Sequence, residues 1–369
     1  MRAGGRRELT RGLFVCTFSC ESACDALWLT RARAVAAPHA PAPRPRYLLN
    51  VQFNILNKQI YNFFPFPWCV RSMSAPRSVP RRRVRRRDSS QPSSSRPPHA
   101  RRFVSCVHLI VGLAVMSVFW VTKVVPFQKP DEQFIKDVSL PAFLHAFGHC
   151  LTNVSFAAVA VSFTHTVKTL EPVFSAAGSY LVSGTVYPLP VYLALLPIMA
   201  GVALASATEL SFTWLGFSTA MASNIAFAGR AIYSKNLMKR MTAVNLYNYV
   251  TIVALLFCIP PTLYFEGAGL AAGLKAAAAK VGTQKLLTML FNVGLYYHLY
   301  NQVAYQALEK VEPITHAVGN VGKRIFVIGF SIVAFGNAIT TQTAIGSIVA
   351  ILGAGLYSYL KATMTESKH

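Results

Sequence analysis

The sequence has few charged residues, and acidic residues are the scarcest among them. Charged residues make up 13% of the 369 residues, and only 13 positions are Asp or Glu. Soluble domains contain about 25% charged residues. Hydrophobic residues make up 53% of the chain, and apolar stretches of about 20 residues recur after residue 102. This composition predicts an all-α membrane protein in contact with membrane lipid.

The sequence also lacks the motifs that would indicate an enzyme. It contains no P-loop, no HExxH and no GxSxG, which are common signatures of nucleotide, zinc and acyl-transfer chemistry. The seven cysteines are scattered, and Cys16, Cys20 and Cys24 have no second cluster of ligands. This spacing predicts neither a metal site nor a disulfide framework. We therefore expect no enzyme activity, no catalytic residue, no metal and no cofactor.

Positive charge is concentrated in the N-terminal part, where residues 1–102 contain 20 of the 36 Lys and Arg. Residues 1–46 are rich in Arg and Ala with few acids, which fits a transit peptide and equally a disordered or wrongly assigned N-terminus. Residues 69–102 are rich in Arg, Ser and Pro, which predicts disorder. The run Arg81–Arg87 could serve a scaffold or bind nucleic acid, but no folded nucleic-acid module accompanies it. We expect no nucleic-acid partner.

Ten segments have the composition of membrane-spanning helices. The first, 47–68, is a partial candidate interrupted by Asn and Lys residues. The other nine lie in a predicted transporter domain, 103–361, that precedes a C-terminal tail, 362–369. They are 103–124, 138–160, 162–184, 189–208, 211–235, 242–265, 285–309, 313–335 and 339–361, with long connections expected only around 123–137 and 266–285.

A THxV sequence occurs at 164–167 and again at 315–318, and each copy precedes a cation in an apolar span. This faint repeat suggests two halves of five helices. Because five is an odd number, the two halves would have inverted topology, with the substrate near the middle of the bilayer.

Three cations in apolar blocks predict a site for a multiply charged anion. Lys168 and Glu171 are the only full charges in 138–208, and Lys323 and Arg324 are the only ones in 313–360. A charge at bilayer depth costs a few kcal/mol and usually lines a polar pathway. One alternative is that Lys168 forms an ion pair with Glu171, which would cancel its charge.

Other polar residues could contribute to such a site. Arg230 competes with Lys168 as the partner of Glu171. His149 and Thr152 are three residues apart and so share a helix face, and Tyr300 lies in an otherwise apolar span. Each of these three could donate a hydrogen bond to a phosphate oxygen, or could be structural and bond a neighbouring backbone carbonyl.

Four stretches of the sequence are long and specific: GHCLTNVSFAAVAVSFTHTVKTLEP (148–172), ELSFTWLGF (209–217), YYHLYNQ (296–302) and THAVGNVGKRIFVIGFSIVAFGN (315–337). They resemble the plastidic phosphate translocators of the drug/metabolite transporter superfamily, most closely the triose-phosphate class. The likeness runs from about Phe103 to Lys361, with a fragment at 47–68.

The resemblance implies a fold of ten helices and a strict exchange of inorganic phosphate for triose phosphates or 3-phosphoglycerate across the inner envelope of the plastid, or chloroplast. It implies a phosphate grip by Thr152, Lys168, Lys323 and Arg324. Sister classes for sugar phosphates or phosphoenolpyruvate, and an anion channel, remain alternatives.

The resemblance also implies roles for the remaining candidates. His149 and Tyr300 would contact the carbon end of the substrate, Phe227 would form the pocket wall, and Glu171 would form a gate ion pair with Arg230.

The chain departs from the family pattern in two places. About 34 residues intervene between FPFPW (64–68) and FVSCVHLIVG (103–112), which directly follow one another in the family, and APAPRPR (40–46) cannot span a membrane. A retained intron and a wrongly assigned first exon explain these departures better than a genuine insertion. The first helix is therefore expected to be incomplete.

Overall fold

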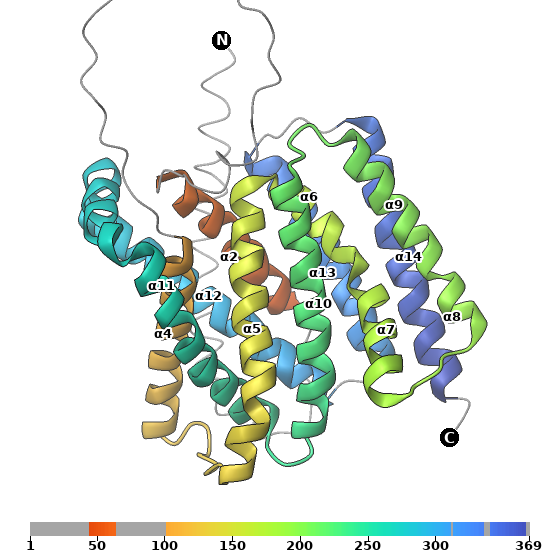
Figure 1. Ribbon diagram of the computed structural model, residues 1–369, viewed down its shortest axis with the longest axis horizontal. Coiled ribbons are helices and arrows are strands. Elements are labelled where there is room, and N and C mark those ends of the chain that lie inside the picture. The colour runs from red at the N-terminus through yellow and green to blue at the C-terminus, as the bar shows by residue number, and fades with distance from the viewer. Residues whose placement is uncertain (1–43, 64–100, 311–312, 336–339, 367–369) are drawn as a thin grey trace, which may run out of the picture.

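The computed structural model describes residues 44–63, 101–310, 313–335 and 340–366, and these residues contain helices but no strand. The all-helical prediction is thus confirmed for this part of the chain, and each of the ten predicted segments overlaps a helix or a series of consecutive helices (Figure 1). The helices are α2 (Arg44–Phe63), α4 (Arg101–Val121), α5 (Glu132–Ala158), α6 (Val161–Val167), α7 (Glu171–Ser183), α8 (Leu189–Leu193), α9 (Leu195–Thr208), α10 (Trp214–Leu237), α11 (Ala243–Val281), α12 (Thr283–Lys310), α13 (Pro313–Phe335) and α14 (Thr341–Glu366).

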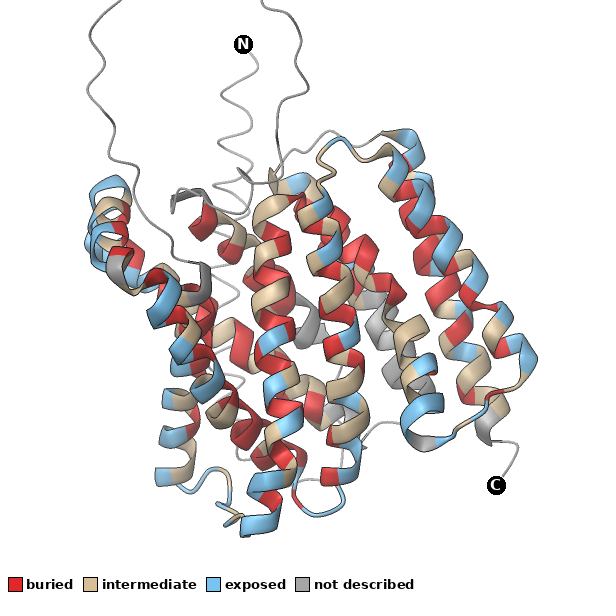
Figure 2. Cartoon of the chain, viewed as in Figure 1, coloured by how far each residue is buried: buried red, intermediate tan, exposed pale blue. Residues whose placement is uncertain are grey.

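The helices pack side by side as one bundle. In Figure 1, α5 and α10 lie together near the middle, α9 and α14 form one edge with α8, and α4 and α11 lie toward the opposite edge. Helix α12 packs against α2 and α4, and α13 packs against α2, α6 and α14. Figure 2 shows buried residues on the inward faces of the helices and exposed residues on the outer faces.

Four segments of the described chain are long and apolar enough to cross a membrane by length and composition. They are Phe103–Val121, Leu189–Thr208, Ala243–Gly267 and Thr341–Met364. Large apolar side chains on their outer faces, such as Val118 and Leu352, are exposed. Helices with satisfied backbones and apolar outer faces are suited to the bilayer interior.

Helix α2 is buried although its sequence is polar. Asn57 Nδ2 donates to Asn153 Oδ1 at 2.9 Å, and Asn54 Oδ1 lies 3.0 Å from His165 Nε2. The Lys58 ammonium donates to the carbonyl oxygens of Phe156 and Val159 at the C-terminal end of α5, where a cation is favourable. The polar residues that weaken 47–68 as an isolated span are therefore its contacts with the bundle. Residues 64–68, like 1–43 and 69–100, lie outside the described residues.

Two of the predicted spans are broken by proline. Pro172 has no N–H to donate to the Lys168 carbonyl, which instead accepts from the Glu171 N–H in a 3-10 turn, Lys168–Leu170, between α6 and α7. Pro197 likewise lacks the N–H that would bond the Leu193 carbonyl, where α8 ends and α9 begins. Proline removes one helical hydrogen bond and crowds the preceding turn. The first of these breaks places the charged residue Lys168 in a 3-10 turn inside the predicted span 162–184.

The long connection expected around 266–285 is wrong. Helix α11 continues from Ala243 to Val281, and the chain turns at Gly282, whose φ is 86°, before α12 begins at Thr283. The segment 268–281 is rich in Ala and Leu, which have high helix propensity, and it contains no proline. The connection after α4 is longer, and it is held by bonds from Asn245 Nδ2 to the Pro126 carbonyl and from the Tyr249 hydroxyl to the Gln128 carbonyl.

Helices α9 and α14 approach each other closely at two glycines. A Cβ atom added to Gly201 would lie 2.5 Å from the Ala350 nitrogen, and one added to Gly346 would lie 2.6 Å from the Ala205 nitrogen. These obstacles are backbone atoms, which cannot rotate away. Small residues at helix contacts allow this backbone packing in membrane proteins.

We expect Gly346→Ala to destabilise the α9–α14 contact by about 1–3 kcal/mol, the usual cost of overpacking. The measurement is thermal unfolding of the purified protein in detergent. The matched control is Gly267→Ala, because a Cβ at Gly267 meets no atom within 4 Å. Equal melting temperatures for the two variants would contradict this prediction, because α9 and α14 would then accept the added methyl group with no loss of stability.

Candidate functional site

The cation predicted to be central lies at the break between α6 and α7. Lys168 Nζ donates to Ser223 Oγ at 3.1 Å and lies 4.5 Å from the centroid of the Phe227 ring. Ser223 and Phe227 are four residues apart on α10 and therefore share one helix face. The hydroxyl and the aromatic ring together hold the ammonium group, since a cation is attracted to the face of an aromatic ring.

Arg230 lies one turn further along α10 and approaches the same ring. Its guanidinium carbon is 4.9 Å from the Phe227 centroid and 5.5 Å from the Tyr305 centroid. Its Nη1 atom lies 2.7 Å from Nδ1 of His145 on α5. Phe227, predicted as a pocket wall, thus lies next to two cations.

Glu171 pairs with Arg324 rather than with Arg230. The Arg324 Nη2 atom donates to Glu171 Oε2 at 2.8 Å, and the two side chains are 9% and 40% exposed. The expected Glu171–Arg230 pair is therefore not the one present in this structure. The reason is positional: Glu171 begins α7 directly after the 3-10 turn and meets α13, while Arg230 is engaged by His145 and the aromatic rings.

The alternative pairing of Glu171 with Lys168 is also not present among the described ion pairs. The carboxylate of Glu171 nevertheless interacts electrostatically with Lys168, Arg230 and Lys323 as well as with Arg324. One carboxylate thus serves four cations that come from the α6–α7 break, α10 and α13. Four basic side chains around one carboxylate give the cluster an excess of positive charge, which is suited to an anion with more than one negative charge.

A second group of polar side chains lies on α4, α5 and α12. His149 Nε2 is 3.1 Å from His108 Nδ1 and 3.4 Å from Asn153 Nδ2, and its ring centroid is 4.2 Å from that of Tyr297. Tyr300 packs against Tyr297 with ring centroids 5.7 Å apart. The His149 ring also stacks on the His145 ring, with centroids 6.3 Å apart, and His145 contacts Arg230, so the second group adjoins the cation cluster.

His145 joins the two groups. Its Nδ1 faces Arg230, and its Nε2 lies 3.0 Å from the Tyr297 hydroxyl. Arginine can only donate, so Nδ1 of His145 must be the acceptor. The neutral ring then carries its proton on Nε2 and donates to the Tyr297 oxygen. This pair of bonds fixes the tautomer of His145 and ties α5 to α10 and α12.

Thr152 is buried on the same face of α5 as His149, and its hydroxyl donates to the Gly148 carbonyl at 2.8 Å. To donate to a phosphate oxygen, it must give up this bond. Side chains at 315–322, including the second THxV, lie outside the described side chains. The first copy contributes His165, whose contact with Asn54 is described above, and Thr166, whose hydroxyl lies 2.9 Å from Ser347 Oγ.

Sequence reasoning missed Ser223, His145 and Tyr297. Helix spacing could have identified them: Ser223 is four residues before Phe227, and His145 is four residues before His149. Positions four apart share a helix face. Tyr297 lies three residues before Tyr300 in the same way.

A cluster of cations inside a bundle that includes four segments apolar enough to cross a membrane is typical of a membrane carrier of anions. The chain belongs to the Triose-phosphate Transporter family, whose sequence profile matches residues 98–358. The name of this family describes transporters.

Several curated relatives are similar over most of the chain. The chloroplastic triose phosphate/phosphate translocator of Solanum tuberosum is 50% identical over 323 residues, which cover 87% of this chain and 70% of the relative. That of Flaveria trinervia is 50% identical, covering 87% and 71%. The chloroplastic xylulose 5-phosphate/phosphate translocator of Arabidopsis thaliana is 39% identical, covering 87% and 69%.

A solved structure covers 87% of this chain and 99% of its own, with 13% identity and a TM-score of 0.42. This similarity is too low to support an argument about the fold.

We expect His145→Leu to destabilise the protein more than Tyr297→Phe does. The leucine leaves a buried arginine donor and the Tyr297 hydroxyl without their partner, and each such loss costs about 1–3 kcal/mol, more for a charged group. Tyr297→Phe leaves only one histidine nitrogen without its partner. Chemical or thermal unfolding of both variants in the same detergent measures the difference, and an equal loss would contradict the assigned bonds.

Proposed function

We propose that this protein is an antiporter that exchanges inorganic phosphate for triose phosphates or 3-phosphoglycerate across the inner envelope membrane of the chloroplast. The observation that carries the proposal is the cluster of Lys168, Arg230, Lys323 and Arg324 around the single carboxylate of Glu171. The names of the relatives support the substrates and the chloroplast location. The lower identity to the xylulose 5-phosphate translocator favours the triose-phosphate class.

The exchanged anions share a phosphate group, and three cations are proposed to hold it. Lys168 and Lys323 supply point charges. Arg324 supplies a planar guanidinium, which can bind two phosphate oxygens at once. Thr152 adds a hydroxyl donor after releasing Gly148. The incoming phosphate competes with Glu171 for Arg324, since both are oxygen anions and the Arg324–Glu171 bond of 2.8 Å occupies the same donors.

The carbon end of the substrate is proposed to extend toward the second group of polar side chains. His149 and Tyr300 contribute a ring nitrogen and a hydroxyl there, and Phe227 forms the wall between the carbon end and the cations. His145 holds Arg230 against Phe227, and in this structure Arg230 forms no ion pair with Glu171. The Glu171–Arg230 pair is then a gate of a different conformation, which would form when Arg230 leaves His145.

One-for-one exchange follows from repulsion among the cations. Closing the carrier without an anion brings Lys168 on one half toward Lys323 and Arg324 on the other. At a separation of 6–8 Å and an effective dielectric constant of about 20, each pair of unit charges repels by about 2–3 kcal/mol. A bound phosphate with nearly two negative charges removes most of this repulsion, and the empty carrier therefore rarely completes the step.

The proposed carrier has ten membrane-spanning helices in two inverted repeats of five, the drug/metabolite transporter fold. The repeats would be α2 to α9 and α10 to α14, with the broken helices counted once. The transporter domain is 103–361, with 47–68 as an incomplete first helix, 1–46 as a transit-like or wrongly assigned segment, 69–102 as an insertion and 362–369 as a tail.

The test of exchange is reconstitution into liposomes and measurement of labelled phosphate uptake. Uptake should require phosphate or a triose phosphate inside the liposomes. Equally fast uptake into empty liposomes, or a steady current in the presence of phosphate, would identify a channel or uniporter and contradict the antiport mechanism.

We expect Lys168→Ala, Lys323→Ala and Arg324→Ala each to lower the exchange rate by at least about tenfold, since a hydrogen bond to a charged group contributes about 1.5–3 kcal/mol. The control is Lys285→Ala, because Lys285 is exposed at the start of α12. All four proteins should insert and purify alike. Normal exchange by any of the three site variants would exclude that residue from the phosphate grip.

We expect Tyr300→Phe to slow 3-phosphoglycerate exchange more than phosphate–phosphate exchange. The substitution removes one hydroxyl donor and little volume, and one hydrogen bond contributes about 0.5–1.5 kcal/mol, or more with a carboxylate partner. Both rates are measured on the same proteoliposomes. An equal fall in the two rates would assign Tyr300 to the packing of Tyr297 and Phe53 or to the common phosphate grip.

A further inference from the structure

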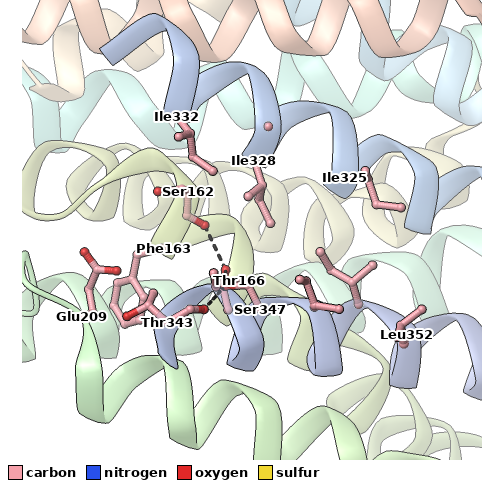
Figure 3. Close-up of a pocket in the computed structure, with 14 residues that line it drawn as sticks. Ser162, Phe163, Thr166, Glu209, Ile325, Ile328, Ile332, Thr343, Ser347 and Leu352 are labelled. Carbon is pink, nitrogen blue, oxygen red and sulfur yellow. Dashed lines mark hydrogen bonds between the residues drawn. The ribbon is translucent and has the colours of Figure 1, made fainter. Parts of the chain in front are cut away.

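A groove separate from the cation cluster lies between α6, α13 and α14 (Figure 3). Its volume is about 360 Å³, within the range of small-molecule sites. Helix α13 contributes Ile325, Ile328 and Ile332, which recur on one helix face, and α14 contributes Ile348 and Leu352. Most of the groove is therefore lined by aliphatic side chains.

The groove opens sideways rather than toward either end of the bundle. Its rim residues Ile325, Ile348 and Leu352 are 54%, 56% and 67% exposed. In a membrane protein, such outward-facing aliphatic side chains contact acyl chains and not water. The occupant of this groove must therefore come from the bilayer.

One end of the groove is polar. Ser162, Thr343 and Glu209 line this end and lie together in Figure 3, away from Ile325 and Leu352. The Ser162 side chain is 3% exposed, and its hydroxyl has no hydrogen-bond partner among the described residues. A buried hydroxyl without a partner costs free energy, so a donor or acceptor from the occupant would stabilise it. Among the residues that the structure describes, no Lys, Arg or His lines the groove.

The polar end lies at the level of the helix ends. Helix α9 ends at Thr208, α6 begins at Val161 and α14 begins at Thr341. The indole of Trp214, at the start of α10, is 72% exposed close to Phe212. Exposed Trp residues are typical of the headgroup level of a membrane. The groove thus runs from the headgroup level toward the bilayer centre.

We propose that this groove binds one membrane lipid, with an acyl chain along α13 and α14 and an uncharged, hydroxyl-bearing headgroup at Ser162 and Glu209. The carboxylate of Glu209 already accepts from Ser211 through Oε1, and a headgroup hydroxyl can donate to it. The same carboxylate repels a phosphate-bearing headgroup, and no cation of the groove offsets this repulsion. The proposal depends on the membrane location of the protein but not on the anions that it exchanges.

The lipid would touch the helix that carries two of the candidate site cations. Ile325 directly follows Arg324, and Ile328 and Ile332 continue the same face of α13. The acyl chain of the lipid would therefore lie between α13 and its neighbours α6 and α14. There it would support the position of Lys323 and Arg324.

The test uses two photoreactive lipids with the same diazirine-bearing acyl chain, one with a monosaccharide headgroup and one with a phosphoglycerol headgroup. The full-length protein in detergent is irradiated with each lipid, and adducts are mapped by peptide mass spectrometry. The sugar lipid should label 325–332 and 343–352, and unlabelled sugar lipid should compete at concentrations about tenfold lower than the phosphoglycerol lipid, a difference of about 1.4 kcal/mol.

Gly329→Phe should fill the groove, because a Cβ at this position meets no atom within 4 Å. We expect it to reduce labelling of these two segments by about tenfold. Gly267→Phe is the matched control, since its Cβ also meets open space and it lies on α11. Glu209→Gln keeps the shape of the polar end, and it should abolish the preference for the sugar lipid even if Gly329→Phe fails to fold.

Labelling spread over all outward-facing helices, without saturation, would mean general contact with lipid and would overturn the proposal. Equal competition by the two unlabelled lipids would do the same, as would unchanged labelling of the Gly329→Phe variant.

Discussion

Positive charge held inside an apolar bundle is stable only beside a counter-charge, and Glu171 supplies one at the centre of the described structure. Its bond to Arg324 ties the α6–α7 segment to α13, and the other three cations lie within its electrostatic range. The Phe227 ring and the Ser223 hydroxyl hold Lys168, and His145 holds Arg230. Each cation thus has a neutral or anionic neighbour that a substrate anion could replace.

The break at Pro172 gives this centre its shape. An unbroken helix would satisfy the Lys168 carbonyl along its own axis and would present Lys168 and Glu171 on neighbouring turns of one cylinder. The 3-10 turn instead directs Lys168 toward α10 and Glu171 toward α13. A proline inside a membrane helix is tolerated where a local 3-10 turn satisfies the freed backbone groups, and here the Glu171 N–H donates to the Lys168 carbonyl.

The sequence predicted the helices and most of the candidate residues, since apolar length and isolated charges are visible without coordinates. Lys168, Glu171, Phe227, Arg230 and Arg324 do come together in the structure.

The choice of ionic partner was not predictable, because Glu171 could reach several cations and only packing decides among them. For this reason we expected a Glu171–Arg230 pair, whereas Glu171 pairs with Arg324 in the structure. The extent of α11 was also missed, because the lysines and glycines of 266–285 lower its hydropathy and hide the high helix propensity of its alanines. All the candidate residues, including Thr152, Lys323 and Tyr300, stay predictions as substrate contacts.

The contacts of α2 have a consequence for how the protein assembles in the membrane. The polar side chains of Asn54, Asn57 and Lys58 form hydrogen bonds with groups on α5 and α6, and both sides of each bond thereby gain a partner. Alone in lipid, the same three side chains would leave several polar groups without partners, each at a cost of several kcal/mol. Helix α2 thus becomes a favourable span only beside α5 and α6, so we expect it to enter the bilayer together with them or after them rather than alone.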